Sequence, residues 1–98
     1  MNKNKINLSL QVLPKTAGNA YQIVDKAIDV IIRSGVNYKV CPFETVMEGD
    51  YDQLLKIAGD AQDACFEAGA EELLVFIKIQ RRKNSDVTME EKMEKYGG

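Results

Sequence analysis

The side chains that could carry chemistry in this chain are carboxylates, amides and hydroxyls, because it has no histidine and only two cysteines. Cys41 and Cys65 form neither a CxxC redox pair nor a zinc-ligand spacing. The sequence also lacks a GxxxxGK phosphate-binding loop and a nucleophile elbow. We therefore expect a binding protein and not an enzyme, with no metal and no cofactor.

Length and charge narrow the possible partners. The 98 residues are expected to form one domain, residues 1–98, and the formal net charge of −2 provides no broad positive field for nucleic acid. The polar start leads into only a short alternating stretch, too short for a signal peptide or a membrane helix. We expect a cytoplasmic protein that contacts neither nucleic acid nor membrane. The basic run at residues 81–83 is expected to be a solvated turn without function.

Three of the polar candidates lie in an alternating stretch. Asn7, Ser9 and Gln11 alternate with apolar residues from Ile6 to Val12, a period of two that predicts a half-buried strand with one polar face. We expect this strand to stop at Leu13 and Pro14, because proline removes a backbone donor.

Two amphipathic helices and three more strands follow. Apolar residues at spacings of three and four predict helices over 20–34, capped by Asn19, and over about 51–68, and each ends on a glycine, Gly35 or Gly69. Cys65 falls in the apolar stripe of the second helix and is expected to pack there. Strands are expected at 36–41, 44–48 and 73–80. Thr88 and Glu91 form a capping box for a short C-terminal helix that carries Met89, Met93 and Tyr96.

The element order β-α-β-β-α-β predicts a ferredoxin-like α+β fold in a single domain. In this fold both helices cover one face of a four-stranded antiparallel sheet with the expected strand order 4-1-3-2, and the short C-terminal helix is additional. The first and third strands are then central.

The face without helices collects the polar candidates. Asn7, Ser9 and Gln11 share it with Leu74, Phe76, Lys78 and Gln80 of the last strand, and Val46 and Glu48 join them if Thr45 and Met47 point towards the helices. A solvated face is one interpretation. The apolar residues favour a covered face, either by another subunit of a homo-oligomer or by a small polar ligand.

Five segments of the chain resemble a known family. They are Leu13–Pro14, Tyr38–Pro42, Thr45–Gly49, Phe66–Gly69 and Glu91–Glu94. Together they resemble the thiamine-binding, YkoF-like family, also called UPF0045 or MTH1187. The resemblance implies a ferredoxin-like domain that associates through its sheet face into dimers or tetramers and binds thiamine or its hydroxymethylpyrimidine part. Thr45 and Glu48 match the family's Thr-x-x-Glu-Gly segment, and Ser9 matches a polar site on the first strand.

These observations give a site hypothesis. Glu48 is expected to bind the ligand and Phe76 to stack on its pyrimidine ring, whereas Lys78 would repel a cation unless it pairs with Glu48. The alternatives are a regulatory or structural oligomer without a small ligand and an enzyme that uses Glu48 and Lys78. The expected ligand-binding residues are Asn7, Ser9, Gln11, Thr45, Glu48, Phe76 and Lys78.

Overall fold

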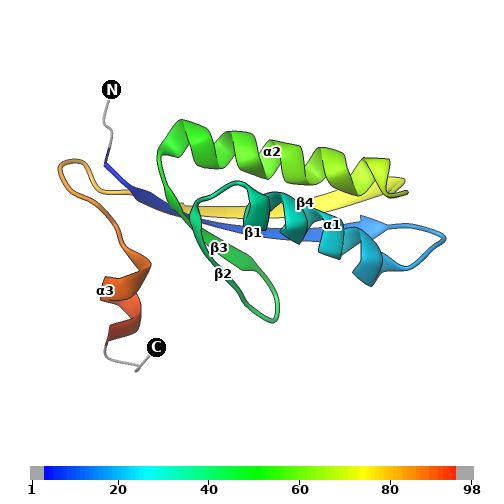
Figure 1. The fold of residues 1–98 in the computed structure, drawn as a ribbon, viewed down its shortest axis with the longest axis horizontal. Helices are drawn as coiled ribbons and strands as arrows, with labels where there is room; N and C mark the ends of the chain where they lie inside the picture. The colour runs from blue at the N-terminus through cyan, green and yellow to red at the C-terminus, as the bar shows by residue number, and fades with distance from the viewer. Residues whose placement is uncertain (1–3, 95–98) are drawn as a thin grey trace.

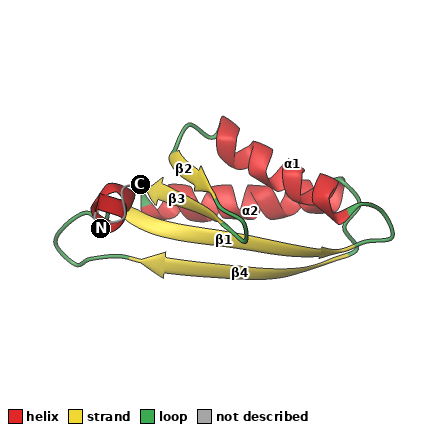
Figure 2. Ribbon diagram, turned by 90° about the horizontal axis from the view of Figure 1, so that it is seen from below, coloured by secondary structure: helices red, strands yellow, loops and turns green. Residues whose placement is uncertain are grey.

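The computed structural model describes residues 4–94 and confirms the expected α+β fold (Figure 1). The sheet is antiparallel in the order β2-β3-β1-β4, and α1 and α2 lie together on one of its faces (Figure 2). The elements are β1 (Ile6–Lys15), α1 (Ala20–Arg33), β2 (Asn37–Val40), β3 (Thr45–Gly49), α2 (Tyr51–Glu67), β4 (Glu72–Gln80) and α3 (Met89–Met93).

The helix ends follow from local side chains and backbone. The Asn19 side chain accepts hydrogen bonds from the backbone N–H groups of Tyr21 and Gln22 and so caps α1. Gly35 and Gly69 follow α1 and α2 with φ of 85° and 113°, in the left-handed region that glycine enters without a Cβ clash. Both predicted glycine ends are confirmed.

The core lies between the helices and the apolar face of β1 and β3. Leu8, Met47 and Leu54 are fully buried, and small residues of α1 and α2 allow the helices to approach the sheet. Cys65 is also fully buried, as its helical position predicts, and burial raises the pKa of its thiol. Among the described residues, no helix is long and apolar enough to cross a membrane.

The predicted end of the first strand is wrong. β1 continues through Pro14 to Lys15, and Pro14 pairs with Leu73 of β4. The pairing of β1 with β3 ends earlier, at Leu10 and Thr45. Proline is tolerated at an unpaired edge, so Pro14 fits where β4 is the single neighbour of β1. Residues 11–15 of β1 and the facing half of β4 therefore form a two-stranded ribbon that projects beyond β3.

Candidate functional site

The predicted polar row lies on the face of the sheet opposite the helices. Asn7 stands between Glu48 of β3 and Gln80 of β4, and Ser9 stands between Val46 and Lys78. The orientation of β3, which the sequence leaves open, is the one that places Val46 and Glu48 on the open face, because Thr45 and Met47 are buried on the helix side. The same fact places Thr45 on the opposite face of the sheet from Asn7, Ser9 and Glu48.

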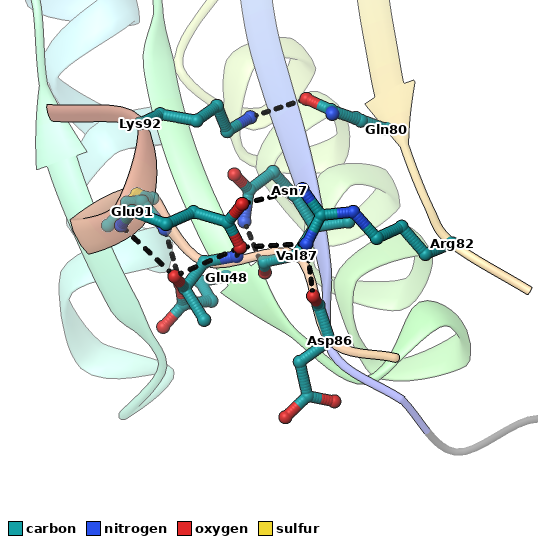
Figure 3. Close-up of polar contacts among 10 residues, drawn as sticks. Asn7, Glu48, Gln80, Arg82, Asp86, Val87, Glu91 and Lys92 are labelled. Carbon is teal, nitrogen blue, oxygen red and sulfur yellow. Dashed lines mark hydrogen bonds and ion pairs between the residues drawn. The ribbon is translucent and has the colours of Figure 1, made fainter. Parts of the chain in front are cut away.

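Asn7 and Glu48 form hydrogen bonds with the segment that leads into α3 (Figure 3). The backbone N–H of Met89 donates to Glu48 Oε1 at 2.7 Å, and Asn37 Nδ2 donates to Glu48 Oε2 at 3.1 Å. Asn7 Nδ2 donates to the carbonyl of Val87 at 3.1 Å. In this structure both side chains position the C-terminal segment. The ligand-binding role expected for Glu48 stays a prediction.

Polar contacts hold α3 in place, because no residue of the helix itself is buried. The expected capping box is present: Thr88 Oγ1 accepts from the Glu91 N–H, and Glu91 accepts from the Thr88 N–H. Arg82 donates through both terminal nitrogens to the Glu91 carboxylate, and Lys92 donates to Gln80 Oε1 at 2.8 Å (Figure 3). Within the basic run, Arg82 therefore has a structural contact with α3, whereas the expectation that residues 81–83 have no binding function stays a prediction.

The expected apolar stripe of the C-terminal helix is only partly described. Met89 and Met93 are half-buried, and Tyr96 lies outside the described residues. Ahead of the helix, Val87 is fully buried, and its N–H donates to the carbonyl of Lys5 at 2.9 Å. Val87 is thus the apolar residue that attaches this segment to the sheet.

The attachment of α3 is expected to depend on pH. The hydrogen bonds from Arg82 and from the Thr88 N–H lower the pKa of Glu91 from 4.5 to about 2. A lowered folded-state pKa means that the stabilisation is fully present above about 4.5 and is lost as the pH falls towards 2. Backbone NMR shifts of residues 88–93 should change in that window. Glu91→Gln should remove this titration, and a midpoint near 4.5 in the unmodified protein would contradict the ion pair.

Further along the open face, four of the predicted residues line a common hollow of about 270 Å³. Its walls are formed by these four residues, Ser9, Gln11, Phe76 and Lys78, together with Glu44 and Ile77. Lys78 Nζ lies 3.7 Å from Glu44 Oε2, so its ion-pair partner is Glu44 and not Glu48. This pair is weak, because the Lys78 side chain is 76% exposed.

A second hollow, of about 390 Å³, lies on the helix side and will be called the helix-side hollow. It opens beside Thr45, the first residue of β3, between α1, the outer half of β1 and the turn from Cys41 to Glu44. The polar side chains of its lining are those of Thr45, Gln11 and Glu44, and Tyr21 adds a hydroxyl. The apolar part consists of Leu10, Val12, Leu13, Val24, Ala27, Ile28, Ile31, Cys41, Pro42 and Phe43, and Tyr21 contributes a ring.

Glu44 and Gln11 line both hollows, so the two hollows meet at the end of the β1–β3 pairing. Sequence reasoning missed Glu44 as a site residue. A signal was available, since Glu44 directly precedes Thr45 of the family-like segment and follows the Pro42–Phe43 interruption. The seven expected residues therefore divide into three places. Asn7 and Glu48 lie beside α3. The open-face hollow contains Ser9, Gln11, Phe76 and Lys78. Thr45 lies on the helix side, in a hollow that Gln11 also lines.

Comparison with known proteins agrees with this fold over almost the whole chain. Residues 8–97 match the family model described as thiamine-binding protein. A UPF0045 protein of Clostridium perfringens is 44% identical over 91 residues, covering 92% of this chain and 95% of the relative.

Solved structures show the same similarity. A domain of unknown function, DUF77, from Bacillus cereus superposes with a TM-score of 0.93 at 43% identity, covering 96% of this chain and 91% of that one. A Thermotoga maritima protein described as a candidate for thiamine biosynthesis or salvage superposes with a TM-score of 0.85 at 26% identity, covering 94% and 98%.

Proposed function

This chain belongs to the thiamine-binding protein family, UPF0045, and from that membership we propose that it binds thiamine or its hydroxymethylpyrimidine part in the helix-side hollow. The proposal is one of binding without catalysis. The observation that carries the choice of site is the composition of this hollow: its walls are mainly apolar, Glu44 supplies a carboxylate, and no lysine or arginine among residues 4–94 lines it.

That composition suits a heteroaromatic cation. Ligand pockets in proteins combine apolar walls with a few polar groups that fix orientation, and they commonly measure about 300–1,000 Å³. The rings of Tyr21 and Phe43 are largely exposed at the hollow and could cover an aromatic ligand. Thr45 and Gln11 offer a hydroxyl and an amide for ring nitrogens and an exocyclic amine.

The open-face hollow fits this ligand less well. It is smaller, and the Lys78 ammonium would repel a thiazolium ring. Asn7 and Glu48 do not line it, because they contact the α3 segment. The helix-side hollow also includes Thr45, which matches the family-like segment.

Calorimetry on ligand-stripped protein should show saturable binding of thiamine and of hydroxymethylpyrimidine with dissociation constants in the micromolar range. A dissociation constant near 1 µM corresponds to a binding free energy of about −8 kcal/mol. Ile28→Trp fills the helix-side hollow and should abolish the binding heat. Ile32→Trp is the matched control, because Ile32 lies on the same helix but does not line the hollow. Binding that survives Ile28→Trp would place the ligand elsewhere, and no heat with unmodified protein would reject the proposal.

A further inference from the structure

A buried polar side chain on the open face of the sheet carries an oxygen without a partner. Asn7 is only 3% exposed, and no group among residues 4–94 donates a hydrogen bond to its Oδ1 atom. α1 and α2 lie on the other face of the sheet, and the segment that leads into α3 lies over Asn7 (Figure 3). A buried acceptor without a donor destabilises the arrangement that buries it, so the position of this segment has an energetic cost.

Asn7 is the middle member of a row of three acceptors. Its neighbours across the sheet are Glu48 on β3 and Gln80 on β4, and we call these three residues the acceptor row. The α3 segment supplies donors to the two outer members. The Met89 N–H donates to Glu48 Oε1, and the ammonium of Lys92 donates to Gln80 Oε1. The segment thus fills the row only in part, because the middle oxygen stays unpaired.

Burial changes abruptly at the start of this segment. Val87 is fully buried, and its N–H donates to the carbonyl of Lys5 at 2.9 Å. None of residues 88–94 is buried, and hydrogen bonds and an ion pair hold them in place. The side chains of that ion pair, Arg82 and Glu91, are 42% and 39% exposed, and exposed ion pairs contribute little stability. Residues 88–94 can therefore lift about a hinge at Val87 while Val87 stays in the fold.

We propose that residues 88–94 form a lid that opens about Val87 without unfolding of the domain, and that the closed lid competes for the acceptor row with cations that carry N–H groups. Closing gains the donors of Met89 and Lys92 but leaves Asn7 Oδ1 unpaired. Opening loses these two hydrogen bonds and lets water reach the whole row. The two terms oppose each other, so the lid opens far more often than the domain unfolds.

The chemistry of the row defines what displaces the lid. Its three oxygens accept hydrogen bonds, and the carboxylate of Glu48 adds a negative charge, so the matching group is an ammonium or amidinium. Lys92 of the lid is itself such a group, held beside the row by the chain. This competition takes place on the open face and does not depend on the proposed thiamine site.

Hydrogen exchange followed by NMR tests the hinge. The Met89 N–H lies on the lid, and the Val87 N–H lies on the anchored side of the hinge. Local opening exposes an amide far more often than global unfolding does, so the Met89 N–H should exchange at least roughly tenfold faster, after correction for intrinsic rates. Equal corrected rates would show that the segment detaches only as a whole and would overturn the proposal.

Glu91→Gln loosens the lid without changing its floor. Glutamine keeps the capping box but removes the charge that pairs with Arg82. Exchange of the Met89 N–H should rise by up to about fivefold, the value of an exposed ion pair. Asp60→Asn is the matched control, because the same acid-to-amide change removes the exposed ion pair with Lys56 on α2, and it should leave this rate unchanged. No rise with Glu91→Gln, or the same rise with both variants, would contradict a lid held by this pair.

Methylammonium chloride tests the competition for the acceptor row. A ligand that binds only a rare open state doubles its population at a concentration equal to the dissociation constant, about a twofold rise in exchange of the Met89 N–H. Tetramethylammonium chloride at the same concentration and pH is the matched control, because it has the same charge but no N–H group, and it should have a smaller effect. Equal effects of the two salts would assign the opening to charge screening. That result, or no effect of methylammonium, would reject the competition.

Discussion

Replacing Leu8 by alanine is expected to lower the free energy of unfolding by about 2–5 kcal/mol. Leu8 is fully buried in the central strand, where it stands between Met47 of β3 and Ile79 of β4. Its removal loses apolar burial and leaves a cavity beneath the two helices. Small domains have only about 5–15 kcal/mol of total stability, so this one change removes a large share.

Urea unfolding followed by circular dichroism measures the effect. Leu13→Ala is the matched control: the same substitution in the same strand, at a side chain that is 46% exposed, should cost less than about 1 kcal/mol. Equal losses from Leu8→Ala and Leu13→Ala would show that burial in this sheet does not determine the cost.

Glu44→Gln is expected to weaken thiamine binding by about 10- to 100-fold, the usual value of a hydrogen bond to a charged group. The change keeps the size of the side chain and removes its charge. Neutral hydroxymethylpyrimidine should lose less affinity than thiamine, because it lacks the thiazolium cation. Calorimetry with both ligands measures the difference.

Two further variants make this test specific. Lys78→Gln removes the cation beside Glu44 and should leave thiamine affinity equal or improved. Glu48→Gln should weaken the attachment of α3 and leave the affinity unchanged, because Glu48 accepts from the Met89 N–H. Loss of affinity in Glu48→Gln with none in Glu44→Gln would move the ligand to the α3 side and restore the role first expected for Glu48.

Local patterns predicted most of the fold. The alternation from Ile6 to Val12, the glycines after both helices and the Thr88–Glu91 capping box each concern residues close in sequence, and each is found in the structure. The end of β1 was missed because it depends on where the pairing of β1 with β3 stops. Proline disrupts a strand only where a neighbour requires its missing donor.

The site was predicted less completely, for the same physical reason. The face carrying Ser9, Gln11, Phe76 and Lys78 follows from strand alternation. In contrast, the contact between Glu48 and the Met89 N–H joins residues 41 positions apart, and nothing in the short C-terminal helix indicates its partner. Glu44 lies just before β3, where alternation no longer assigns a face, so its place at both hollows appears only in three dimensions.

The point at which the pairing of β1 with β3 stops also affects the shape of one wall of the helix-side hollow. Two-stranded ribbons twist more strongly than wide sheets, because fewer neighbours resist the rotation of each strand. Val12 and Leu13, which line the helix-side hollow, belong to the two-stranded part of the sheet. We therefore expect the wall facing α1 to be more strongly twisted than the three- and four-stranded part of the sheet, so that the local coiling of one strand pair helps to set the width of the hollow.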